Sequence, residues 1–279
     1  MISETPSLTP EQFEQIRDII RAGFGISFAE SDRNLVERRL GERLAELHLE
    51  SFGPYVHLLA GGDRRELTRA IDVLTNNETY FFREDEQLGC FTREVLPDLR
   101  DRSAAAQSLS VWSAGCSSGE EVYTIAMLLL ESGFFNGWRM RVFGSDVSSR
   151  MIARARRGLF GASAFRNTPS TVQRRHFRTT EDSWLVNDDL RAMCNFAMLN
   201  ILDEDAVCVV GRFDVIFCRN VLMYFDAAAK ERSIRVLYNR LNPGGVLLLG
   251  HTESLLTMTT DFEPLQLKNA LVYRKVRDS

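Results

Sequence analysis

The chain has 279 residues, of which 44% are hydrophobic and 26% charged, and its formal net charge is −4. These values are typical of soluble globular proteins and exclude a wholly disordered, collagen-like or coiled-coil chain. No apolar run approaches the roughly 18–20 residues of a membrane span, and the acidic first residues predict no signal peptide, so we expect a cytoplasmic protein.

The first 75 residues predict only helices. Apolar residues recur at helical spacing after Pro10, with Thr9 as the expected N-cap, and Gly23 and Gly25 end this helix. Three further helical patterns follow, at 31–47, 51–60 and 63–74. Because no strand pattern interrupts them, we expect a small helical domain.

From about residue 105, short apolar runs alternate with helical patterns. The expected strands are 109–114, 139–145, 193–199, 213–218 and 245–250, and the expected helices are 119–131, 148–157 and 226–241. Strands that alternate with helices predict parallel βαβ units. A last run, 270–276, predicts an added edge strand.

Two features of the first βαβ unit predict a nucleotide-like ligand. Gly115 and Gly119 lie in the turn after the first strand, where glycine allows a positive φ and a close approach of the backbone to a ligand. Asp146 ends the next strand, where a ribose needs a carboxylate. The incomplete glycine pattern disfavours a nicotinamide dehydrogenase. The structural alternatives are a capping box of Ser118 with Glu121 and a helix cap at Asp146.

Two more polar motifs predict parts of a site. The first, TNNETYFFR (75–83), joins the helical and the βα parts, and its polar and aromatic residues predict the wall of a ligand pocket; the alternative is a capped helix start with core phenylalanines. In the second, FCRNVLMYF (217–225), Arg219 and Asn220 follow a buried strand, where open α/β sheets bind ligands. Tyr224 could face the same crevice.

Cysteine and histidine give no metal pattern. The five cysteines include no CxxC pair, and the four histidines are widely separated. This disfavours a disulfide framework, a structural zinc site and a metallohydrolase centre, so we expect buried thiols and no metal. For His251 we expect a structural role.

One segment is strongly basic. Residues 147–178 contain eight arginines and no acid. The segment fits docking of an acidic partner and, equally, solvated helix faces whose arginine stems cover apolar surface. We expect no nucleic acid as partner, because no stacking aromatic module accompanies the arginines.

Together, these motifs resemble the CheR family of chemotaxis protein-glutamate O-methyltransferases. The matching segments are NNETYFFRE (76–84), VWSAGCSSGEEVYTIA (111–126), VFGSDVSS (142–149), FDVIFCRNVLMYFD (213–226) and LNPGGVLLLGHTES (241–254). The resemblance implies an α/β fold with a doubly wound, mostly parallel sheet. It also implies a helical receptor-docking domain at 1–75, a linker at 76–92 that contributes to the cofactor site, a methyltransferase domain at 93–279 and an antiparallel insertion at about 170–192.

The resemblance further implies methyl transfer from S-adenosyl-L-methionine to glutamate side chains in the cytoplasmic helices of membrane chemoreceptors, leaving S-adenosyl-L-homocysteine. Arg83 and Tyr224 match the residues closest to the transfer. The candidate cofactor-binding residues are Asn77, Thr79, Arg83, Gly115, Glu121, Asp146, Asn200, Ile201, Arg219 and Asn220. We expect a monomer that does not insert into the membrane.

A glutamate side chain is already ionised at neutral pH, so such a transfer needs positioning rather than a general base. Our hypothesis is that Arg83 and the Tyr224 hydroxyl steer this carboxylate. The insertion is short, so we expect recognition that does not depend on a C-terminal receptor peptide. The rival functions are a methyltransferase acting on another protein or a small carboxylate, and a cofactor-binding adaptor without catalysis.

Overall fold

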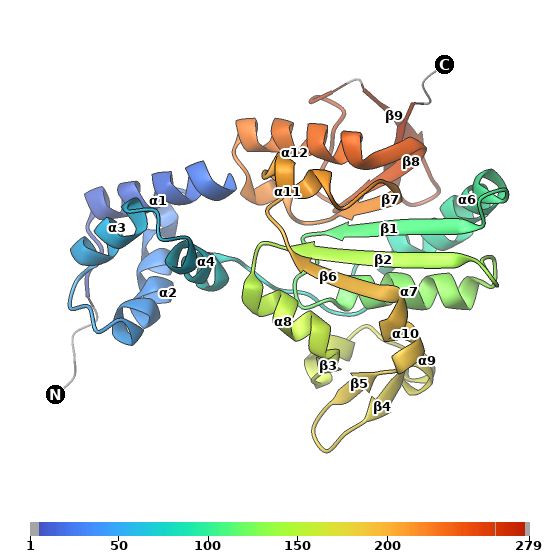
Figure 1. Ribbon diagram of the computed structural model, residues 1–279, viewed down its shortest axis with the longest axis horizontal. Coiled ribbons are helices and arrows are strands. Elements are labelled where there is room, and N and C mark those ends of the chain that lie inside the picture. Colours follow the sequence, from blue (N-terminus) through green and yellow to red (C-terminus); the bar gives the residue numbers. More distant parts are fainter. Residues whose placement is uncertain (1–5, 260, 277–279) are drawn as a thin grey trace.

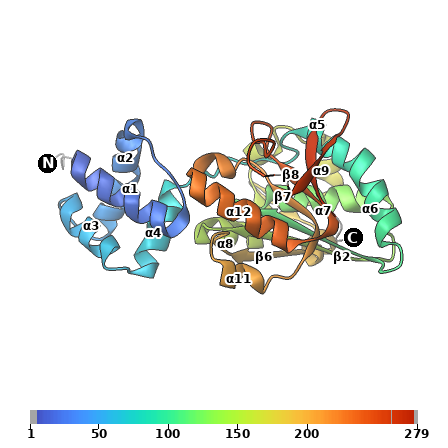
Figure 2. The same ribbon diagram turned by 90° about the horizontal axis from the view of Figure 1, so that it is seen from above.

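The structure, a computed structural model, describes residues 6–259 and 261–276 as a helical domain (10–74) followed by an α/β domain (85–275). The helical domain lies against one end of the α/β domain in both views (Figures 1 and 2).

The helical domain has the four helices that the sequence predicts. They are α1 (Pro10–Phe24), α2 (Arg33–Glu46), α3 (Phe52–Ala60) and α4 (Arg64–Leu74). The Thr9 hydroxyl accepts the Gln12 N–H, and the Gln12 side chain accepts the Thr9 N–H, so the predicted N-cap is confirmed as a capping box. Gly25 ends α1 with a φ of 69°.

The core of the helical domain is apolar, with one buried ion pair. The apolar core includes Phe13, Ile16, Ile20, Val36, Leu40 and Leu44. The Arg43 guanidinium lies 2.7 Å from the Glu66 carboxylate, which also accepts the Tyr55 hydroxyl at 2.9 Å. A buried charge is stable only when it is paired, so this cluster fixes α2, α3 and α4 to one another.

The α/β domain is built on a seven-stranded sheet with the order β6-β2-β1-β7-β8-β10-β9. The strands are β1 (Ser108–Ala114), β2 (Arg139–Asp146), β6 (Cys194–Met198), β7 (Phe213–Cys218), β8 (Leu241–Leu249), β9 (Phe262–Gln266) and β10 (Leu271–Lys275). The first five strands in this order are parallel to one another. β10 runs antiparallel to its neighbour β8, and β9 runs antiparallel to β10. The predicted edge position of 270–276 is wrong, because β9 forms the edge and β10 lies inside it.

Helices cover both faces of the sheet, which confirms the doubly wound fold. The helices of the domain are α5 (Asp85–Cys90), α6 (Leu96–Ser103), α7 (Glu120–Ser132), α8 (Ser149–Arg157), α9 (Ser170–His176), α10 (Asp188–Met193), α11 (Glu204–Cys208) and α12 (Ala227–Arg240), of which α9 packs beside a second, small sheet rather than on the main sheet. Neighbouring strand residues point to opposite faces. Val111 and Val215 belong to the core under α6 and α7, whereas Trp112 and Ile216 belong to the core under α11 and α12.

A small antiparallel sheet with the order β3-β5-β4 lies beside the main sheet. Its strands are β3 (Leu159–Phe160), β4 (Phe177–Thr179) and β5 (Trp184–Val186). The expected range of about 170–192 contains β4 and β5, but the third strand lies earlier in the chain. The expected linker at 76–92 also differs, because α5 begins at Asp85 and buries Leu88.

The two domains are joined by polar contacts at the start of α8. The Asp72 carboxylate of α4 accepts the hydroxyls of Ser148 at 2.6 Å and Ser149 at 2.7 Å, and the N–H of Arg150 at 3.2 Å. On the other side of the junction, the Asn200 side chain donates to the Gly23 carbonyl oxygen at 2.9 Å. These contacts place the helical domain over the carboxyl ends of the parallel strands.

Candidate active site

A pocket of about 380 Å³ lies where the two domains meet at the carboxyl ends of the parallel strands. It is lined by every residue that the sequence suggested for the site, namely Asn77, Thr79, Arg83, Gly115, Glu121, Asp146, Asn200, Ile201, Arg219, Asn220 and Tyr224. Ligands of open α/β sheets bind at this place in the fold. The structure therefore brings these residues together, while their individual roles stay predictions.

The turn between β1 and α7 exposes backbone to the pocket. Gly115 has a φ of 85°, and a Cβ there would collide with Val221. Gly119, with a φ of 96°, is the residue that caps α7. The suggested capping box of Ser118 with Glu121 is not formed, because the Ser118 hydroxyl bonds to the Glu120 carboxylate instead. Glu121 instead accepts the Ser113 hydroxyl at 2.7 Å and pairs with Arg219 in the wall of the pocket.

Asp146, at the end of β2, is held by two backbone groups. Its carboxylate accepts the Ser117 N–H at 2.8 Å and the Ser148 N–H at 2.9 Å. Burial raises the pKa of Asp146 above its ordinary value; the two N–H groups oppose this rise, and the nearby charge of Asp72 adds to it. The cap of α8 is Ser148 rather than Asp146. Asp146 therefore lies in the pocket wall as a pre-oriented acceptor.

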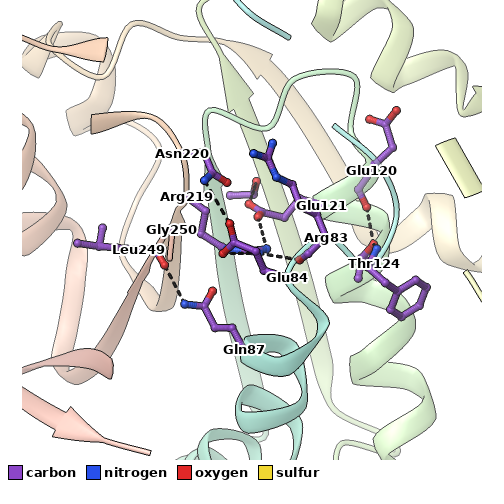
Figure 3. A network of polar contacts seen from close by, with 12 residues as sticks. Arg83, Glu84, Gln87, Glu120, Glu121, Thr124, Arg219, Asn220, Leu249 and Gly250 are labelled. Carbon is purple, nitrogen blue, oxygen red and sulfur yellow. Dashed lines mark hydrogen bonds and ion pairs between the residues drawn. The ribbon is translucent and has the colours of Figure 1, made fainter. Parts of the chain in front are cut away.

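Arg219, which lines the pocket, lies at the centre of a network of ion pairs and hydrogen bonds (Figure 3). Its guanidinium lies 2.9 Å from the Glu121 carboxylate and 3.0 Å from the Glu84 carboxylate, and it donates to the Arg83 carbonyl oxygen at 2.6 Å. The Arg219 side chain is only 3% exposed. Because its charge is already shared by two acids, we infer that Arg219 mainly orients Glu121 and the backbone at Arg83.

Glu84 is the part of this network that the sequence did not reveal. Its backbone has a φ of 56°, and its carboxylate accepts the Asn220 side-chain N–H at 3.2 Å. Burial alone would raise the pKa of Glu84, but the positive charge of Arg219 and hydrogen bonds from Arg219 and Asn220 lower it below its ordinary value. Glu84 therefore stays ionised and holds two site residues in place.

Arg83 and Tyr224 lie at the more open part of the pocket. Arg83 donates from Nη1 to the Glu78 carbonyl oxygen at 2.8 Å, which uses one of its five N–H groups. The Tyr224 hydroxyl accepts the Asn76 side-chain N–H at 3.3 Å, and Tyr224 is 36% exposed. Both groups can meet a ligand that enters from solvent.

The helical domain supplies a wall that the sequence analysis missed. Its apolar lining residues include Phe24, Ile26, Phe28 and Leu35, and Asp32 and Arg39 add polar groups. The sequence does hold a sign of this wall: Ile26 and Phe28 follow Gly25, between two predicted helices, where they belong to the apolar face of neither helix. Glu253 was also missed; it accepts the backbone N–H groups of Asn220, Gly250 and Met223 and so ties together the loops after β7 and β8.

Within the described ranges, no group of three or more histidine, cysteine, aspartate or glutamate side chains is arranged to hold a metal ion. Among the same residues, no helix is both long and apolar enough to cross a membrane.

Comparisons with known proteins agree with this geometry. Residues 77–271 match the family model "CheR methyltransferase, SAM binding domain", and residues 11–75 match "CheR methyltransferase, all-alpha domain". The chain is 35% identical over 276 residues to "Chemotaxis protein methyltransferase 2" of Vibrio cholerae, covering 96% of this chain and 94% of that protein. It is 34% identical over 282 residues to "Chemotaxis protein methyltransferase" of Escherichia coli, covering 99% and 95%.

Proposed function

The chain belongs to the CheR methyltransferase family, and on this basis we propose that it transfers a methyl group from S-adenosylmethionine to glutamate side chains of chemoreceptors. The observation that carries the proposal is the pocket between the domains, which brings Asp146 and Glu121 together with Arg83 and Tyr224. We further propose that the protein acts as a monomer in the cytoplasm on the cytoplasmic helices of membrane chemoreceptors.

The pocket fits the cationic methyl donor. Asp146 and Glu121 would accept hydrogen bonds from the donor's hydroxyl and ammonium groups. The backbone of Gly115 faces the pocket without a side chain, and any larger residue there would collide with Val221. Phe28 and Ile201 are among the apolar residues that would cover its base. When bound, the donor supplies an electrophilic methyl group on a positively charged sulfur.

The residues of the chain have a positioning task. The accepting glutamate has an ordinary pKa of about 4.3 and is ionised at neutral pH, so no residue needs to remove a proton from it. Arg83 and the Tyr224 hydroxyl would orient this carboxylate. Alignment of reacting groups contributes up to ~7–11 kcal/mol to such reactions. Tight packing at the domain junction would exclude water from the anionic oxygen.

A label-transfer assay tests this function. The protein is incubated with methyl-tritiated donor and a cytoplasmic chemoreceptor fragment, and protein-bound counts are measured before and after mild base. We expect counts that base releases as methanol, because a carboxyl methyl ester is base-labile. Arg83→Ala should bind donor but lose most of the counts. Base-stable counts, or label only on small carboxylates, would contradict the proposal, and donor binding without any transfer would indicate an adaptor.

A further inference from the structure

Two rows of arginines meet at the junction between the domains. On α4, Arg65 and Arg69 precede Asp72 at the spacing i, i+4, i+7, which places all three on one side of the helix. On α8, Arg150, Arg154 and Arg157 have the same spacing. Buried Asp72 contacts the N–H of Arg150, so the two rows meet end to end. The helices α4 and α8 lie next to each other in both views (Figures 1 and 2).

These five arginines, which we call the arginine stripe, are all exposed. Within the part of the chain that the structure describes, none of them forms an ion pair with a carboxylate. The Arg150 guanidinium donates to the Asp72 backbone carbonyl oxygen at 2.9 Å. Burial raises the pKa of Glu120, and the charge of Arg154 is one of the groups that oppose that rise. The Asp72 carboxylate is itself occupied by hydroxyl and N–H donors. The stripe therefore presents positive charge to solvent.

The stripe leads to the rim of the pocket from both domains. Leu74, the last residue of α4, and Thr75, which follows the helix, line the pocket, as do Asp146 and Val147, which precede α8. At 1.5 Å per residue, the arginines extend about 6 Å along α4 and about 10 Å along α8. A rod-shaped partner that lies along the stripe would thus pass the opening through which a substrate side chain must enter.

We propose that the arginine stripe is a docking surface for an acidic helical segment of the protein substrate. This inference rests on the proposed function and names the surface that would deliver the substrate. The charge is opposite to that of an acidic helix, the surface bridges the two domains that form the pocket, and it is continuous with the pocket rim.

Charge reversal tests the stripe. Two double variants, Arg65→Glu with Arg69→Glu on α4 and Arg154→Glu with Arg157→Glu on α8, are compared with a control that carries the same change in charge. The control is Arg212→Glu with Arg235→Glu, since both residues are exposed and Arg235 lies on α12, across the sheet from α8. Glutamine versions of the stripe variants exclude effects of negative charge at a helix end.

The measurements are the KM for an acidic cytoplasmic receptor fragment, the Kd for the same immobilised fragment, and the calorimetric Kd for the methyl donor. At 0.1 M salt we expect each stripe variant to raise KM and the fragment Kd about tenfold, with kcat and donor affinity within about twofold of wild type. At 0.5 M salt the differences should shrink to about threefold or less. The control should behave as wild type.

The outcomes separate the stripe from the proposed function. If wild type methylates the fragment but the stripe variants keep their KM and Kd, the docking inference is wrong and the function stands. If no label is transferred, yet salt-sensitive binding depends on the stripe, the function is wrong and the docking surface stands. Stripe-dependent binding of a 20-nucleotide duplex, with unchanged affinity for the fragment, would replace the acidic helix by nucleic acid and overturn the inference.

Discussion

Replacing Asp72 by alanine should weaken both the domain junction and donor binding. Ser148 connects the two effects: its hydroxyl donates to Asp72 of the helical domain, and its N–H donates to Asp146 in the pocket. Without the Asp72 carboxylate, the fully buried Ser148 hydroxyl loses its acceptor, and the backbone that orients Asp146 is less constrained. Asp72 therefore acts on the donor through Ser148 and Asp146, as a positioning residue.

The magnitude follows from the bonds that are lost. Asp72→Ala removes two hydroxyl bonds and one N–H bond to a buried carboxylate, and we expect a loss of about 2–4 kcal/mol in the free energy of unfolding. Looser orientation of Asp146 should raise the donor Kd about tenfold, which corresponds to ~1.4 kcal/mol. A smaller effect opposes the rise in the donor Kd. Removing the charge of Asp72 lowers the pKa of Asp146, so Asp146 is more readily ionised and is a better acceptor for the donor.

Calorimetric titration with S-adenosylhomocysteine measures the Kd at the donor site. Thermal unfolding measures the loss of stability, and the rate of limited proteolysis within 75–84 measures how far the domain junction has loosened. Asp63→Ala is the matched control, because Asp63 caps the other end of α4 through the N–H groups of Arg65 and Glu66. It should cost about 1 kcal/mol of stability and leave the Kd unchanged. An unchanged Kd in Asp72→Ala, or an equal loss of affinity in Asp63→Ala, would refute the coupling.

Three further predictions concern the site. Glu84→Gln should destabilise the protein at neutral pH. Because folding lowers the pKa of Glu84, the ionised side chain stabilises the fold above the ordinary glutamate pKa, and this stabilisation is lost as the pH falls through the lowered pKa. In urea unfolding, the difference in stability between variant and wild type should therefore shrink in acid. Arg219→Met leaves Glu84 and Glu121 unpaired and should cost about 3–5 kcal/mol in urea unfolding and weaken donor binding in calorimetry; unchanged stability would contradict the network. Tyr224→Phe should lower kcat about tenfold with the donor Kd unchanged, and a normal kcat would remove Tyr224 from carboxylate steering.

The sequence predicted the parts of the fold that rest on local patterns. The run FDVIFC, which is apolar except for Asp214, predicted a buried strand at 213–218, and β7 has these bounds, because a strand covered on both faces favours apolar residues on both sides. The strand β9 was missed: its sequence FEPLQ contains a proline, and only Phe262 of its five residues is buried. The two-residue strand β3 is too short to give a period.

The site residues were predictable where a motif marks the end of a strand. Glu84 was missed because its partner Arg219 lies 135 positions further along the chain, and only the folded backbone places the two charges together. The same holds for Asp72, which in the sequence is one acid of an amphipathic helix and in the structure joins two domains. Contacts between distant segments depend on packing, which short patterns do not encode.

In the mechanism proposed above, the site aligns an already ionised carboxylate and needs no general base. The most direct test is the single-turnover rate of methyl transfer at saturating donor and receptor fragment, measured from pH 6 to 9. Because the accepting glutamate is ionised throughout this range, the account predicts a rate that stays constant within about twofold. A tenfold rise per pH unit over part of this range would reveal an essential base and contradict the account.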